Sequence, residues 1–218
     1  MTIKVLLGNS RAFIQGEQLK INQPHIYDCS VPDSLVVSVP AMRQLCKHKL
    51  GRWENVCSSP ANRSISLLSL AGTEFISFAK GAAFANDLYH SWVAPTLKSD
   101  LLVQFWHRST GILPSDCSPN WEVLNIDLIS PGQRITFKTT HDHSKWAISA
   151  GDSRKGSRTS GGWVCVGDIN RDETEEKRGG GTVCHQDAVV WKAYRSAALQ
   201  CETCSGAVQT CDKAIQYC

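Results

Sequence analysis

The segment His143-Ser144-Lys145 has the residue types and spacing that could do chemistry in this chain. In an extended backbone, positions i and i+2 point to the same face, so the imidazole and the ammonium group of this H-x-K segment would lie side by side. A second predicted strand, later in the chain, ends in Gly167-Asp168-Ile169-Asn170. If the two strands are neighbours, a histidine, a lysine and an asparagine can converge on one phosphate group.

These three side chains suit phosphoryl transfer. A histidine such as His143 can attack phosphorus or protonate a leaving oxygen, and Lys145 would supply a fixed positive charge. The amide of Asn170 would donate hydrogen bonds to the phosphorane oxygens, and Asp168 is expected to support the site from beneath. This chemistry requires no metal or other cofactor, and the sequence contains no H-E-x-x-H motif and no P-loop. Taken alone, H-x-K is more typical of a surface histidine and a solvated lysine.

The elements that must position these residues are strands interspersed with helices, which predicts an α/β domain. We expect a hairpin of strands at 64–70 and 73–78, joined around Ala71-Gly72. Further strands are expected at 101–106, 123–129, 145–149, 163–168 and 182–184. Apolar residues at helical spacing predict helices over 85–97 and 187–199, and a charged, glycine-rich loop is expected over 171–181.

The composition predicts one ordinary globular domain, because 42% of the 218 residues are hydrophobic and 20% are charged. No stretch approaches the run of about 20 apolar residues that crosses a bilayer, so no membrane partner is expected. The net charge of +3 is too small to identify a nucleic-acid binder. Seven histidines would add positive charge below pH about 6.5, so an anionic partner would be held better in acid.

Ten cysteines exceed what a reducing cytosol usually tolerates, and most lack the paired spacing of zinc sites. Disulfides formed in an oxidising compartment are therefore expected, and zinc binding after Cys201 is the less favoured alternative. Asn62-Arg63-Ser64 is an N-glycosylation acceptor, which points to the same oxidising compartment. The first residues lack the apolar run of a signal peptide, so we expect that the beginning of the chain is missing.

Several runs around the H-x-K segment resemble the deoxyribonuclease II family, which belongs to the phospholipase D superfamily. They are D-H-S-K-W-A-I-S at 142–149, W-V-C-V-G-D-I-N-R at 163–171 and R-G-G-G-T-V-C at 178–184. The resemblance continues upstream through 75–80, 87–89, 103–107 and 111–115, and downstream to Cys201. It covers nearly the whole chain from about Gln18, and it matches the C-terminal half of the family.

The resemblance implies a phospholipase D-like mixed β-sheet flanked by helices, as one repeat of a two-repeat fold. That repeat would span residues 1–201, followed by a cysteine-rich tail at 202–218. The implied activity is an acid endonuclease that cuts DNA without a metal, through a phosphohistidine, and leaves 3′-phosphate ends. The implied catalytic residues are His143, as nucleophile or general acid, and Lys145, with Asn170 binding phosphate.

Each repeat of the family contributes one H-x-K, and this chain contains one. The resemblance therefore implies that a missing N-terminal half or a second copy of the chain completes the site. The superfamily often has an aspartate five residues after the motif lysine, where this chain has Ala150. The competing hypothesis is a truncated, catalytically incomplete, cysteine-rich secreted protein that binds DNA or serves as a subunit.

The resemblance also bears on the cysteines. It pairs Cys117 with Cys201, and Cys165 with Cys184 across the glycine-rich loop, whereas Cys46 and Cys57 are expected to form a local bridge. Six basic residues are expected on loops around the site, as a track for the DNA backbone or as a solvated rim. They are Arg154, Lys155, Arg158, Arg171, Lys177 and Arg178.

Overall fold

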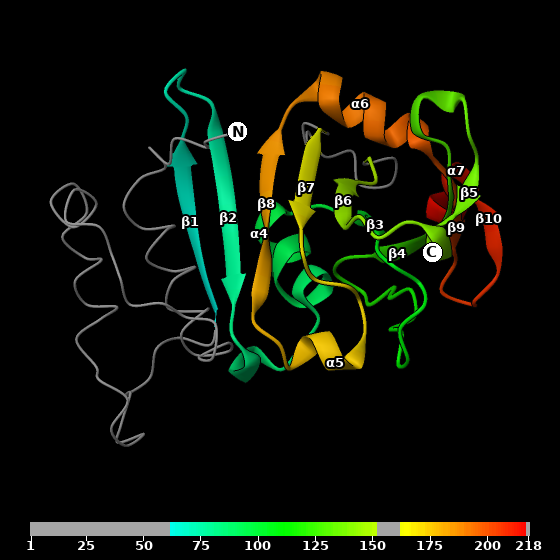
Figure 1. The fold of residues 1–218 in the computed structure, drawn as a ribbon, viewed down its shortest axis with the longest axis horizontal. Coiled ribbons are helices and arrows are strands. Elements are labelled where there is room, and N and C mark those ends of the chain that lie inside the picture. The colour runs from blue at the N-terminus through cyan, green and yellow to red at the C-terminus, as the bar shows by residue number, and fades with distance from the viewer. Residues whose placement is uncertain (1–61, 152–161, 217–218) are drawn as a thin grey trace, which may run out of the picture.

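The computed structural model describes residues 62–151 and 162–216, with side chains as far as residue 214 (Figure 1). Among these residues, ten strands form one mixed sheet in the order β1-β2-β8-β7-β6-β3-β4-β9-β10, and β5 pairs with β4. The strands are β1 (Asn62–Leu68), β2 (Glu74–Lys80), β3 (Leu101–Gln104), β4 (Val123–Ile129), β5 (Phe137–Lys138), β6 (Trp146–Ser149), β7 (Trp163–Gly167), β8 (Gly180–Gln186), β9 (Ala198–Glu202) and β10 (Val208–Thr210).

Short helices connect the strands of this sheet. They are η1 (Ala82–Phe84), η2 (Tyr89–Val93), α4 (Ala94–Leu97), η3 (Pro131–Gln133), η4 (Thr139–His141), α5 (Glu173–Glu176), α6 (Ala188–Ala197) and α7 (Cys211–Gln216). Of these, η2 is a π-helix and the other η segments are 3-10 helices. None of the described helices has the length and apolar character needed to cross a membrane. The architecture is α/β, as the sequence predicted.

The expected hairpin is confirmed by β1 and β2, which pair antiparallel with Leu68 opposite Glu74. Its turn includes Gly72 at φ +79°, a left-handed conformation that glycine adopts at little cost. The strand expected at 123–129 is β4 with the same bounds. The helix expected over 85–97 forms later than predicted, because Ala85 is also left-handed and the carboxylate of Asp87 accepts the Tyr89 N–H at 2.9 Å.

The core lies on both faces of the sheet, because neighbouring residues of its central strands point in opposite directions. On β3, Leu101 and Val103 pack into one hydrophobic cluster with residues of η2 and α4. Leu102 packs into the other cluster, on the face that Trp191 and Tyr194 of α6 cover. Figure 1 shows α6 running across one end of the central strands. The phospholipase D-like identity of this sheet stays a prediction.

The segments that the sequence singled out lie at one end of four neighbouring strands, β8, β7, β6 and β3. Strand β6 is antiparallel to β3 and to β7, and β7 is antiparallel to β8. The residues after β3, before β6, after β7 and before β8 therefore meet at the same end of the four strands. Helix α5 lies at this end, which is the lower edge in Figure 1.

The disulfides agree with one sequence expectation and correct another. Cys165 and Cys184 are directly opposite each other on β7 and β8 and are bonded, as expected. The expected pairing of Cys117 with Cys201 is wrong, because Cys117 bonds to Cys204 and Cys201 bonds to Cys211. The side chain of Cys201 is buried in the same hydrophobic cluster as Cys211, the first residue of α7, and bonds to it. Cys117 bonds instead to Cys204, three residues after Cys201 in the chain.

Residues 202–216 continue the packing of the sheet. Strand β10 pairs with β9, and the described side chains of α7 include the buried Cys211 and Ala214. The division at residue 201 stays a prediction, but the described part of the tail packs on the same domain. Cys46 and Cys57 lie outside the described residues. Asn62 opens β1, the outermost described strand, where its side chain is partly exposed.

Candidate active site

The imidazole of His143 and the ammonium group of Lys145 are in direct contact just before β6, at this end of the strands. Lys145 Nζ lies 2.9 Å from His143 Nδ1 and donates a hydrogen bond of 2.5 Å to the His143 carbonyl oxygen. Lysine has no acceptor, so Nδ1 of the neutral ring accepts and the ring proton is assigned to Nε2. His143 is exposed and Lys145 is 7% exposed, so the pair presents an imidazole to solvent above a largely buried cation.

A short turn, held from β3, positions His143. The side chain of Asp142 accepts the Ser144 N–H at 3.1 Å, as aspartate often does in turns. The buried Gln104 amide donates to Asp142 Oδ2 at 2.9 Å and to the Ser144 carbonyl at 3.4 Å. Gln104 was missed by sequence reasoning, although a glutamine at the end of the apolar run L-L-V-Q is a usable signal. These bonds fix the turn on both sides of the imidazole.

Trp106 links the histidine to Asn170. Its ring centroid lies 4.8 Å from that of His143, and its backbone N–H donates to Asn170 Oδ1 at 3.3 Å. Because the amide oxygen of Asn170 is occupied in this way, its NH2 group is left as a donor. Asn170 is 9% exposed. The structure thus connects the segments of His143 and Asn170 through Trp106, a residue to which the sequence analysis gave no role.

Asp168 joins the end of β7 to the start of β8. Its carboxylate accepts the Gly181 N–H at 2.8 Å, and its own N–H donates to the Gly181 carbonyl at 3.2 Å. A β-carbon at Gly181 would come within 1.9 Å of the Phe78 carbonyl oxygen, so only glycine fits between the strands here. Asp168 is exposed and makes a structural bond of the expected kind, and its supporting role stays a prediction.

Helix α5, at the same end of the strands, carries a buried carboxylate, Glu175, that the sequence analysis did not identify. Asp172 caps the helix by accepting the N–H groups of Thr174 and Glu175 at 3.1 and 2.9 Å. Glu175 is 6% exposed, and burial raises the pKa of its carboxyl group. Burial lowers the pKa of Lys145, and the charge of Glu175 is the largest influence that opposes this shift. The sequence predicts a charged loop at the acidic run E-T-E-E, which in the structure forms α5.

A buried ion pair lies directly beside Asn170 in the chain. Arg171 donates to Asp87 Oδ2 through Nε at 2.9 Å and approaches the same oxygen through Nη2 at 2.8 Å. It also donates to Asn125 Oδ1, and the Asn125 amide donates to Glu202 Oε2 at 2.8 Å. Arg171 is 2% exposed, so its expected place on an exposed DNA track or solvated rim is wrong.

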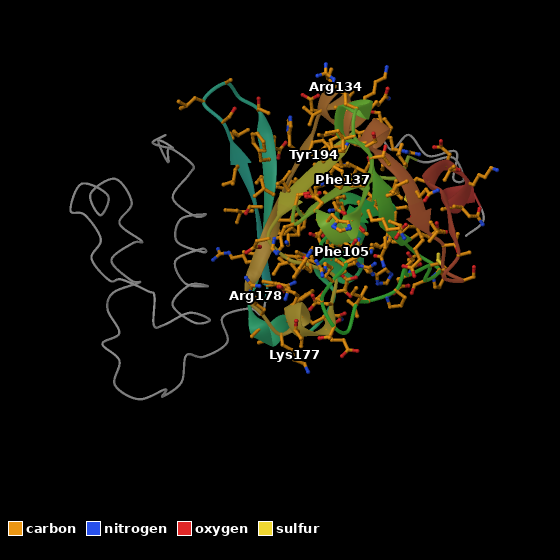
Figure 2. The ribbon with its side chains drawn as sticks, turned by 45° about the vertical axis from the view of Figure 1, so that its right-hand side comes forward. Phe105, Arg134, Phe137, Lys177, Arg178 and Tyr194 are labelled. Atoms are coloured by element: carbon orange, nitrogen blue, oxygen red, sulfur yellow. A yellow bond between two sulfur atoms is a disulfide. The ribbon has the colours of Figure 1, made fainter. Side chains whose placement is uncertain are left out.

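Two of the other expected basic residues are exposed near the site. Figure 2 shows Lys177 and Arg178 at the α5 end of the sheet, and both are exposed. Arg154, Lys155 and Arg158 lie outside the described residues. Among the described residues, Lys177 and Arg178 are therefore the two expected basic residues that could belong to a DNA track.

His107 corrects the expectation that all seven histidines charge together. Its ring centroid lies 4.1 Å from that of Phe105, and no hydrogen-bond partner of its Nε2 is found among the described residues. Burial lowers the pKa of His107 to about 4, with smaller opposing influences from Asp127 and Glu202. Burial therefore favours the neutral imidazole of His107 over the charged form.

A cavity of about 410 Å³ lies beside the buried ion pair. Its lining includes Asp87, His90, Ser115, Asp116 and Arg171, and it does not include His143 or Lys145. The cavity is therefore separate from the H-x-K contact. Among the described residues, no group of three or more His, Cys, Asp or Glu side chains is arranged to hold a metal ion.

Comparison with known proteins supplies the context for this geometry. A family model described as Deoxyribonuclease II matches residues 9–204. Deoxyribonuclease-2-alpha of Rattus norvegicus is 40% identical over 191 residues, which is 87% of this chain and 51% of that protein. Plancitoxin-1 of Acanthaster planci is 36% identical over 190 residues, 87% of this chain and 50% of that protein. Deoxyribonuclease-2 of Caenorhabditis elegans is 38% identical over 185 residues, 85% and 46% respectively. The chain spans about half the length of the curated relatives it matches.

Proposed function

Because the chain belongs to the deoxyribonuclease II family, we propose that it supplies one half of an active site that hydrolyses DNA phosphodiesters at acidic pH. His143 and Lys145 are its catalytic residues in this proposal, and Asn170 binds the phosphate. The observation that carries the proposal is the 2.9 Å contact between Lys145 Nζ and His143 Nδ1, beside an asparagine whose amide oxygen is already occupied. An imidazole can transfer a proton during phosphoryl transfer, and a cation and an amide donor can stabilise the charge on the phosphate oxygens.

In the proposed reaction His143 acts as the general acid. The neutral ring accepts from Lys145 at Nδ1, so the ring must first take up a proton there, which ends this contact and leaves a proton on each nitrogen. A second, neutral histidine attacks phosphorus and forms a P–N bond, while the charged His143 ring protonates O5′ as the P–O5′ bond breaks. Water then attacks phosphorus, gives a proton to His143 and releases the first histidine. The products are a 3′-phosphate and a 5′-hydroxyl.

The second histidine must come from outside this chain, because the sequence holds one H-x-K segment. A histidine that protonates the leaving oxygen cannot also attack from the opposite side of phosphorus. We therefore propose that the N-terminal half of a longer protein, or a second copy of this chain, completes the site. A monomeric preparation of the chain should be nearly inert, and nuclease activity should follow a dimer or the two-half assembly.

The disulfides support a lysosomal or secreted location. Three disulfides are present among the described residues, and such bonds persist in oxidising compartments. Asn62 would accept N-linked glycan in the same compartments, on a partly exposed residue of the outermost described strand. An acidic compartment would also favour the charged ring that the general acid of the proposed reaction needs.

A second candidate function is DNA binding without cleavage, and the single H-x-K segment favours it. Lys145, Asn170 and the exposed Lys177 and Arg178 could hold a phosphate backbone without a second histidine. Binding of this kind is sensitive to salt, and each phosphate contact contributes a slope of about 0.9 in log K against log salt. The two functions differ in what His143 does, because a binder does not need its proton.

The test is nicking of supercoiled plasmid at pH 5 in excess EDTA, with sedimentation of the same preparation. His143→Ala should abolish nicking and leave DNA affinity nearly unchanged, because the imidazole is one phosphate contact among several. Lys145→Ala should abolish nicking and lower the salt slope by about 0.9. His141→Ala is the matched control, since this exposed histidine lies two residues before the motif. Nicking that requires magnesium at neutral pH would overturn the proposal, and binding without nicking in every assembly would favour the second function.

A further inference from the structure

Asn170 lies beyond the regular part of the sheet, so contacts outside the strand ladder must hold it. Strand β7 ends at Gly167, and its last pair with β8 joins Gly167 to Thr182. Asn170 comes three residues after this last paired residue. The orientation of its side-chain amide therefore depends on what holds residues 169, 170 and 171.

The hydroxyl group of Tyr89 reaches the peptide group that precedes Asn170. Tyr89 Oη donates a hydrogen bond of 3.0 Å to the Ile169 carbonyl oxygen, and both residues are buried. The carbonyl of Ile169 and the N–H of Asn170 belong to one planar peptide group, so the hydroxyl fixes the plane from which Asn170 departs. Burial raises the pKa of Tyr89, so the hydroxyl keeps its proton and remains a donor in acid and at neutral pH.

Asp87 holds both Tyr89 and the residue on the other side of Asn170. Its Oδ1 accepts the Tyr89 N–H at 2.9 Å, and its Oδ2 accepts from Arg171 Nε at 2.9 Å. Tyr89 is also the first residue of η2, and π-helical turns are rare and often lie at functional sites. The start of η2 thus holds Ile169 by its carbonyl and Arg171 by its side chain, and Asn170 lies between them.

We propose that Tyr89 is a positioning residue for the phosphate site: its hydroxyl fixes the Ile169–Asn170 peptide group so that the side-chain amide of Asn170 faces the phosphate. The inference rests on the proposed function, in which that amide binds phosphate. The Trp106 N–H holds Asn170 Oδ1 at 3.3 Å, so the NH2 group is oriented by one contact on the backbone and one on the side chain. Donors to a transition state must be in place before the reaction, and a displacement of about 1 Å can cost about a hundredfold in rate.

Tyr89 also packs in the core, so the test must separate its hydroxyl from its ring. The ring belongs to the hydrophobic cluster that contains Phe105 and Ile169. Tyr89→Phe keeps the ring and removes only the hydroxyl hydrogen bond. Val93→Ala is the matched control, because Val93 is the last residue of η2 and is buried in the same cluster. This control loosens the same helix without removing a hydrogen bond.

The order of Asn170 can be measured without DNA, from NMR relaxation of its side-chain amide nitrogen. In the parent chain we expect an order parameter of about 0.8, close to that of rigid backbone. Tyr89→Phe should lower it below about 0.6, and Val93→Ala should leave it at the parent value. The inference is overturned if the amide is as ordered in Tyr89→Phe as in the parent, or if Val93→Ala loosens it as much.

The consequence for catalysis is measured as nicking of supercoiled plasmid in EDTA by the assembled protein. Tyr89→Phe should lower kcat about tenfold and change KM little, because the Asn170 amide stabilises charge that develops in the transition state. Since the hydroxyl keeps its proton, the loss should be the same factor from about pH 4.5 to 6.5. A kcat equal to that of the parent overturns the inference.

A double-variant comparison shows whether the loss acts through Asn170. Asn170→Ala removes the amide, so adding Tyr89→Phe to it should change kcat by less than about twofold, whereas Val93→Ala should have the same effect in both backgrounds. A tenfold loss that persists without the Asn170 amide would show that Tyr89 acts elsewhere. Absence of nicking by the parent in every assembly counts instead against the proposed function, and the order parameters then decide the inference alone.

Discussion

Replacement of the buried Arg171 by methionine is expected to destabilise the fold rather than to remove a DNA contact. Arg171 is 2% exposed and holds Asp87 at 2.9 and 2.8 Å, and it also donates to Asn125. Methionine fills much of the same volume but leaves the Asp87 carboxylate buried without its cation. Removing one partner of a buried ion pair costs about 3–5 kcal/mol, so we expect the free energy of unfolding to fall by about 4 kcal/mol.

Urea unfolding followed by tryptophan fluorescence measures this loss. With a slope of about 2 kcal/mol per molar urea, the expected loss lowers the unfolding midpoint by about 2 M. Adding Asp87→Leu should recover much of it, because replacing a whole buried ion pair by apolar side chains is often close to neutral. Arg134→Met is the control, because this arginine is exposed and a surface substitution usually changes stability by less than about 0.5 kcal/mol, so its midpoint should change by less than about 0.3 M.

Two results would refute this reasoning about Arg171. One is a midpoint of Arg171→Met no lower than that of Arg134→Met, which would mean that Asp87 does not depend on the arginine. The other is an unchanged midpoint together with weaker DNA binding, which would return Arg171 to the exposed track that the sequence suggested.

Three further changes test other parts of the structure. Cys165→Ala together with Cys184→Ala should lower the free energy of unfolding by about 3 kcal/mol in the same urea titration, because the bond closes a loop with a sequence separation of 19; a loss below about 1 kcal/mol would contradict this. Gln104→Leu should slow plasmid nicking about tenfold to a hundredfold and leave the urea midpoint nearly unchanged, because the turn that carries His143 loses its support from β3; an unchanged rate would show that the turn holds without it. His107 should titrate near pH 4 by NMR, below its value of about 6.5 in the unfolded chain. The unfolded state then binds the extra proton, so His107→Phe should remove a loss of stability that the parent shows as the pH falls from about 6.5 to 4.

The central strands could be predicted from sequence because each is an apolar or β-branched run between turn residues. Strand β4 shows this most clearly, since its predicted bounds are those in the structure. The convergence of the segments of His143 and Asn170 was also predictable, because they flank strands that prove to be neighbours. Both predictions needed only the local apolar pattern of each strand and the positions of the site residues relative to the strand ends.

Features that depend on tertiary contacts could not be read in the same way. Arg171 looks like any loop arginine until Asp87 and Asn125 are brought to it from distant elements. Glu175 lies in a run of acids, and sequence alone does not say which of them the fold buries. Cys117 pairs with Cys204 because β9 turns Cys201 toward α7, which depends on packing and not on spacing.

The most direct test of the central claim is analysis of the DNA ends made by the assembled protein at pH 5 in EDTA. A 5′-labelled oligonucleotide duplex is cut, and its products are treated with a 3′-phosphatase before electrophoresis. The account predicts 3′-phosphate and 5′-hydroxyl ends, formed by the parent and His141→Ala and missing with His143→Ala. Ends that carry a 5′-phosphate, or cutting that persists without His143, would contradict it.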